Sequence, residues 1–101
     1  MERTDHNSAD EALRHLLGQP SYAAQVLLVT ATILELAPTR PVDHETREHA
    51  LDVAHDAILA TLPDPVSRDA MDRAYRALPE LTGISRGEYA LRLRHAAKEL
   101  G

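Results

Sequence analysis

Residues 22–37 read YAAQVLLVTATILELA, a run that only Gln25, Thr30, Thr32 and Glu35 interrupt with polar side chains. The chain has no Phe, Trp or Cys, so this run is the strongest candidate for the centre of a hydrophobic core. Its β-branched residues would also suit a strand. The run is, however, too long for a typical strand, it does not alternate, and no second segment could pair with it. We therefore predict a buried helix over 21–37.

Shorter amphipathic segments lie on both sides of this run. Ser8 with Glu11, and Ser85 with Glu88, form capping boxes, and Asp43 and Asp64-Pro65 are further start signals. Gly18-Pro20, Pro38 and Pro79 end helical patterns. These signals predict an all-α fold, a compact bundle of about five helices over 8–17, 21–37, 43–62, 64–78 and 85–100. Residues 1–7 are expected to be a disordered tail, and residues 8–101 a single domain.

The helix over 21–37 is apolar nearly all round, whereas the other predicted helices are amphipathic, with apolar residues on one face only. In a monomer the four short neighbours would only just enclose it, and large exposed apolar patches are rare on monomers. We therefore expect a homodimer that pairs through this helix, with the predicted helix over 8–17 as a second candidate contact. The residues expected at its core or dimer contact are Val26, Leu27, Val29, Ile33 and Leu34.

Composition limits the setting of the protein. The 101 residues carry a net charge of −5 and no cysteine, so disulfides and thiolate metal sites are excluded. Acidic residues near the start do not fit a signal peptide, and sixteen residues are fewer than the roughly 20 that span a membrane. We expect a cytoplasmic protein without a membrane partner. The acidic residues are concentrated in the first part of the chain, and residues 66–101 are slightly basic.

The start of the predicted third helix is rich in potential metal ligands. Spacings of three and four place Glu45, His49, Asp52 and Asp56 on one helix face. Oxygen and imidazole groups in this arrangement could bind a divalent ion. The competing interpretation is a solvated acidic face, because no other segment offers matching ligands. No cofactor is expected, and the absence of a phosphate loop or a recognisable nucleophile motif favours a protein that is not an enzyme.

The C-terminal third contains a different pattern. Ala74-Tyr75-Arg76-Ala77-Leu78 precedes Gly83-Ile84-Ser85-Arg86-Gly87 and Arg92-Leu93. Residues 74–100 weakly resemble the helix-turn-helix of sigma-factor region 4. The resemblance implies that the last helix enters the DNA major groove, with base-facing and phosphate-facing residues. These residues would be Arg86, Glu88 and Arg92 at base edges, and Arg73, Arg76, Arg94 and Lys98 at phosphates.

Three functions therefore remain open from the sequence. The first is a small non-enzymatic regulatory protein that acts through contacts with another protein. The second is a helix-turn-helix DNA-binding regulator, and the third is a bundle that binds a metal or small ligand.

Overall fold

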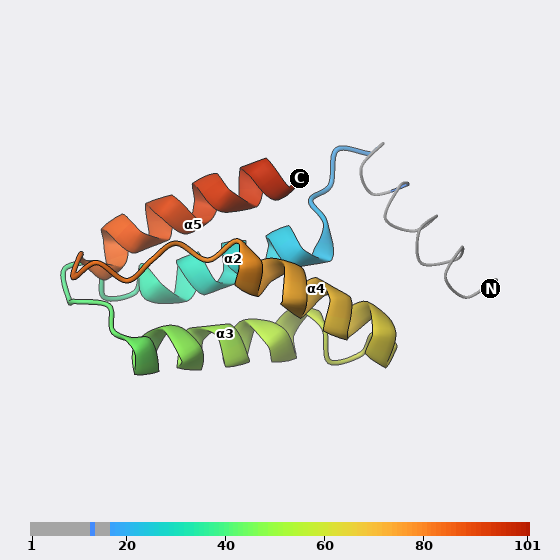
Figure 1. Cartoon of the computed structure of the whole chain (residues 1–101), viewed down its shortest axis with the longest axis horizontal. Coiled ribbons are helices and arrows are strands. Elements are labelled where there is room, and N and C mark those ends of the chain that lie inside the picture. The colour runs from blue at the N-terminus through green and yellow to red at the C-terminus, as the bar shows by residue number, and fades with distance from the viewer. Residues whose placement is uncertain (1–12, 14–16) are drawn as a thin grey trace.

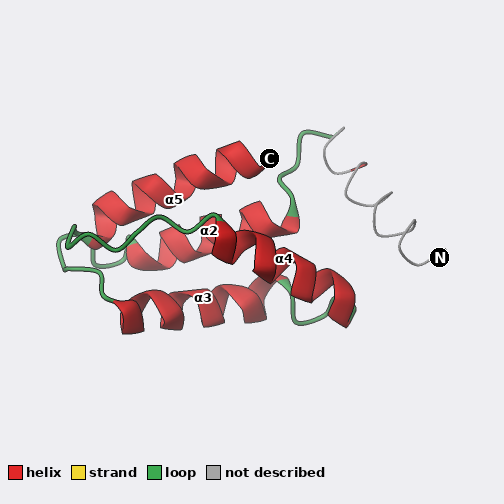
Figure 2. Ribbon diagram, viewed as in Figure 1, coloured by secondary structure: helices red, strands yellow, loops and turns green. Residues whose placement is uncertain are grey.

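The structure, a computed structural model, describes residue 13 and residues 17–101. These residues form four helices: α2 (Tyr22–Leu34), α3 (His44–Ile58), α4 (Asp64–Arg76) and α5 (Arg86–Leu100). Figure 2 shows that the labelled elements are all helices, which confirms the predicted all-α class for the described part of the chain. The predicted tail over 1–7 and most of the predicted helix over 8–17 lie outside the described residues.

Helix α2 is the central element. It packs against α5 most extensively, and also against α3 and α4, and Figure 1 shows it between α5 and α3 with α4 on the near side. Eight of its thirteen residues are buried, among them Val26, Leu27 and Leu34. Val29 and Ile33 are partly buried and pack against the same core. The neighbours thus cover within one copy most of the apolar surface that suggested a homodimer.

The helix starts follow local capping chemistry in three of four cases. Ser21 Oγ accepts from Ala24 N at 3.2 Å, Asp43 Oδ1 accepts from Thr46 N at 2.7 Å, and Ser85 Oγ accepts from Glu88 N at 3.2 Å. The Asp64-Pro65 start signal predicts Asp64 as the cap residue and Pro65 as the first helical residue of α4, and this prediction is wrong. Asp64 is the first helical residue, and Pro63 stands at the cap position, where it offers no side-chain hydrogen bond.

Three helices end earlier than predicted. After Leu34, the amides of Leu36 and Ala37 bond the carbonyls three residues back, so the chain tightens into turns before Pro38. Leu36 is 82% exposed, so burial does not hold it in the helix. Similar i to i+3 bonds follow α3, at Leu62, and α4, at Ala77 and Leu78.

Helices α2 and α5 run antiparallel and are joined at both ends. At one end Ser21 N donates to Gly101 O at 3.0 Å. At the other, Gly87 N donates to Pro38 O at 2.9 Å and Arg86 N donates to Arg40 O at 2.8 Å. A Cβ on Gly87 would lie 3.1 Å from Pro38 Cβ, so this close approach needs glycine. These contacts fix the two helices in one register.

Candidate functional site

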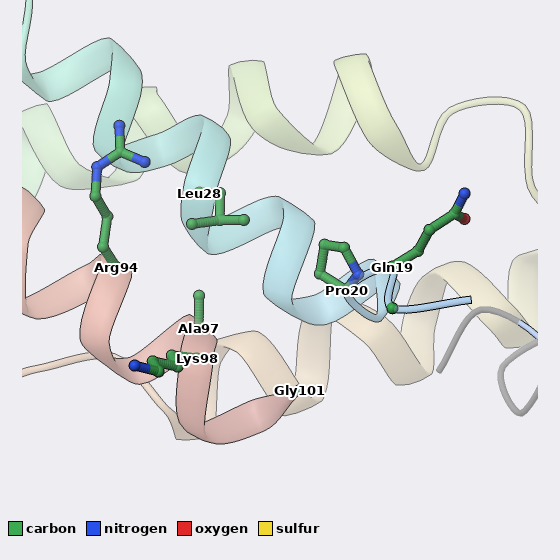
Figure 3. A pocket seen from close by; sticks show the side chains of 8 residues that line it. Gln19, Pro20, Leu28, Arg94, Ala97, Lys98 and Gly101 are labelled. Carbon is green, nitrogen blue, oxygen red and sulfur yellow. The ribbon is translucent and has the colours of Figure 1, made fainter. Parts of the chain in front are cut away.

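An open groove lies between the first half of α2 and the last half of α5. It encloses about 380 Å³ and its exposed lining is mostly apolar. In Figure 3, Leu28 on α2 and Ala97 on α5 point toward one another across it. The residues that line the groove are Gly18, Gln19, Pro20, Leu28, Arg94, Ala97, Lys98 and Gly101. The antiparallel register of α2 and α5 therefore builds a concave apolar surface with cationic side chains beside it.

An ion pair bridges the two helices at one end of the groove. Arg94 donates to both carboxylate oxygens of Glu35, at 2.9 and 2.6 Å, and to Thr32 Oγ1 at 3.1 Å. The hydrogen bond from Arg94 holds the pKa of Glu35 below its ordinary value, and Glu35 raises the pKa of Arg94. The pair is thus ionised together at neutral pH, and Arg94 is directed onto α2.

Two exposed leucines lie farther along the same helix pair. Leu36 is 82% exposed and Leu91 is 66% exposed. Because Gly87 meets Pro38 and Arg94 meets Glu35, Leu91 lies at the level of Leu36 along the antiparallel pair. We call the groove together with Leu36 and Leu91 the α2–α5 face.

The predicted DNA-binding residues are dispersed and several have internal partners. Arg86 donates to Pro41 O at 3.0 Å and to Thr46 Oγ1 at 3.4 Å, and Arg94 is held by Glu35. Exposed ion pairs join Arg76 to Asp72 at 2.8 Å and Arg92 to Glu88 at 3.4 Å. Arg73 is half-buried on α4, and Lys98 lines the groove. The structure therefore does not gather this set into one basic surface directed at a ligand.

The geometry around α5 also differs from the resemblance. Helix-turn-helix motifs join their two helices by a turn of about three or four residues. Here residues 77–85 connect α4 to α5, and α4 packs on α2. The first amides of α5 donate to Arg40 O, Pro38 O and Ser85 Oγ, so they are already occupied. DNA binding stays a prediction that these contacts do not favour.

The predicted metal ligands Glu45, His49, Asp52 and Asp56 are exposed along α3. Among residue 13 and residues 17–101, no three His, Asp or Glu side chains are grouped so that they could hold a metal ion. Metal binding by this set stays a prediction without a preformed site in the described residues.

The structure brings together three polar residues that sequence reasoning did not connect. His55 Nε2 lies 3.4 Å from Ser67 Oγ, and His55 Nδ1 lies 3.4 Å from Asp56 Oδ1. The short connection between α3 and α4 places Ser67, in the first turn of α4, beside the end of α3. The order of these groups resembles a Ser-His-Asp triad. Both contacts are at the outer limit of a hydrogen bond and the Asp56 side chain is 83% exposed, so the cluster lacks the buried carboxylate of that arrangement.

Comparisons of the chain with protein-family models, with curated proteins and with solved structures find no match. No described helix combines the length and the apolar character needed to cross a membrane. The function proposed below therefore rests on the geometry of the α2–α5 face.

Proposed function

We propose that this chain is a small, non-enzymatic, cytoplasmic regulatory protein whose α2–α5 face binds a helix of another protein. The observation that carries the proposal is the apolar groove between Leu28 and Ala97, and the exposed Leu36 and Leu91 lie on the same helix pair beyond the Arg94–Glu35 ion pair. Isolated exposed leucines are ordinary, so the groove carries the proposal, and the two leucines add apolar area near it. Helix-in-groove recognition uses this kind of surface.

The charges beside the groove indicate what the partner helix would carry. Lys98 is exposed and lines the groove, and the half-exposed guanidinium of Arg94 beside it is already paired with Glu35. A helix with an apolar stripe and flanking acidic residues would complement both features. The α2–α5 register is fixed at both ends, so the surface is preorganised and little ordering is required on this side of the interface.

A second copy of the chain is one form that the partner could take. In this form the homodimer would pair through the α2–α5 face, and Leu28 would be the α2 residue in the contact. Sedimentation equilibrium over a range of concentrations tests this form directly. A single species of 11.1 kDa at micromolar concentration would exclude it.

The experiment that tests the wider proposal compares the wild type and three variants, all tagged, full-length and expressed in the native cells. Leu36→Asp and Leu91→Asp place a charge on the α2–α5 face, and Val53→Asp places one on the exposed side of α3, where Val53 is 41% exposed. Circular dichroism first establishes that all three fold. Quantitative mass spectrometry then measures which proteins each variant retains.

We expect one protein to be enriched with the wild type and with Val53→Asp, and to lose at least about tenfold with the two face variants, which corresponds to about 1.4 kcal/mol. A partner retained equally by all four proteins would show that binding uses another surface. If all three variants lose the partner equally, the α2–α5 face is not its specific site.

A further inference from the structure

The residues that lead into α2 form one wall of the groove. Gly18, Gln19 and Pro20 line it directly, so the preceding segment is attached at the edge of the apolar surface. The two described leucines of that segment are exposed, Leu13 by 54% and Leu17 by 65%. Leu17 N donates to Leu13 O at 3.0 Å, a bond with helical i to i+4 spacing. Two exposed leucines thus lie in the chain directly before the residues that form a wall of the apolar groove.

The sequence of this segment has the pattern of a helix that packs by one face. Ala9, Ala12, Leu13, Leu16 and Leu17 recur at intervals of three and four. A helix of about ten residues is marginal in water unless its apolar face is covered. The segment therefore needs a docking surface, and the α2–α5 groove is the apolar surface beside its attachment point.

Residues 18–20, which connect the segment to α2, have the length and the backbone conformation that a reversal of chain direction requires. Antiparallel helices are commonly joined by two to five residues, and only residues 18–20 separate Leu17 from the cap residue Ser21. Gly18 has φ of +76°, the left-handed conformation in which a helix ends and its chain changes direction. Pro20 then prevents the first helix from continuing into α2.

We propose that residues 8–17 are an internal occupant of the α2–α5 groove. The segment folds back antiparallel to α2 and places Leu13 and Leu17 against Leu28 and Ala97. It would then compete with the partner helix for the same surface, and this second part rests on the function proposed above.

Charge supports the same arrangement. Residues 8–17 contain Asp10 and Glu11 against Arg14, and the groove presents the exposed Lys98 beside the Arg94–Glu35 pair. The acidic segment thus matches the chemistry expected of a partner helix. A three-residue tether also gives it a high effective concentration at the groove.

The experiment uses a single fluorescent probe in the full-length chain. Lys98→Cys introduces the only thiol, because the chain has no cysteine, and an environment-sensitive dye attached there reports whether the groove is covered. The probe is placed in three backgrounds: the otherwise wild-type chain, Leu13→Asp with Leu17→Asp, and His15→Asp. His15 lies on the opposite side of the helical pattern from the leucines and is the control for an added charge.

We expect the dye to emit at shorter wavelength in the first and third proteins, and to shift to longer wavelength in the double leucine variant. The emission should not change on dilution, because the contact lies within one molecule. An unchanged emission in the double leucine variant would overturn the proposal. A signal lost on dilution would also overturn it, because the occupant would then be the segment of a second copy.

The result of the docking experiment can be distinguished from the result of the test of the proposed function. The probe measures docking of the segment in the isolated protein, whether or not a partner exists. If docking occurs but the double leucine variant binds the partner no more tightly than the wild type, the competition is refuted and the docking stands. If the segment does not dock, retention of the partner by the face variants still tests the proposed function.

Discussion

Helices α5 and α4 both pack on α2, but they are held in different ways. Helix α5 buries Tyr89, Ala90, Leu93 and Ala97, and backbone hydrogen bonds join both of its ends to the α2 region. Helix α4 buries only Ala70 and Ala74 and has no side-chain cap at its start. The difference shows that contact with the same central helix does not imply the same contribution to stability.

The reason lies in the side chains that each helix presents. Large apolar residues in α5 remove much more surface from water than two alanines do, and burial contributes roughly in proportion to that area. Tyr89 adds a polar anchor, since its hydroxyl donates to Pro79 O at 2.6 Å and accepts from Arg47 at 3.3 Å. The rigid α2–α5 pair is therefore the part of the fold that can hold a preorganised binding surface.

The largest expected effect compares truncations in the two helices. Leu93→Ala removes a side chain with 0% exposure and should lower the free energy of unfolding by about 2–5 kcal/mol. Met71→Ala, in the partly buried row of α4, should cost no more than about 1–2 kcal/mol, because its site is already partly hydrated. Urea denaturation followed by circular dichroism measures both. Equal losses would contradict the comparison.

A smaller effect is expected where α5 meets the loop after α2. Gly87→Ala should destabilise by about 1–2 kcal/mol, because the new methyl group would lie 3.1–3.2 Å from Pro38 atoms and outweigh the gain in helix propensity. Gly83→Ala is the comparison. A Cβ at position 83 has no atom within 4 Å, so the loss of stability there comes only from the φ of +77°. If Gly87→Ala were more stable than the wild type, Pro38 would have to move away from the added methyl group at little cost.

The smallest effect concerns the ion pair within the α2–α5 face, and it depends on pH. The pKa of Glu35 is lowered in the folded state, so its contribution is present above the unfolded value of about 4.5 and is lost as pH falls through the folded value. Glu35→Gln should cost at most about 1 kcal/mol at neutral pH, since both side chains are more than a third exposed.

Urea midpoints measured from pH 7 down to pH 3 test this expectation. The difference between the wild type and Glu35→Gln should shrink toward the acidic end. The exposed Glu80→Gln provides the control for removal of one carboxylate. A difference that stays constant with pH would mean that the pair does not contribute through its charge.

Local patterns predicted much of the fold, because capping and periodicity act over a few residues. Ser21, Asp43 and Ser85 cap their helices as expected, and Val26, Leu27 and Leu34 are buried. Helix ends were less predictable, because they depend on burial. Leu36 continues the apolar pattern in the sequence and yet is exposed after the helix has ended.

The candidate site was harder to predict than the fold. The resemblance to a helix-turn-helix implied that Arg94 would contact DNA phosphates. Its partner Glu35 is 59 positions away, and no local pattern reveals such a pair. His55 and Ser67 are on different helices, and likewise only the tertiary fold brings them together. The groove depends on the register of α2 and α5, which long-range contacts determine.

The hydrogen bond from Ser21 to Gly101 has a consequence for the topology of the described fold. It places the start of the central helix beside the end of the last one, so residues 21 and 101 are neighbours in space. A short linker between them would permit circular permutation, with new termini opened in the turn between α3 and α4. Such a permutant would keep the α2–α5 pair intact and would lack residues 1–20.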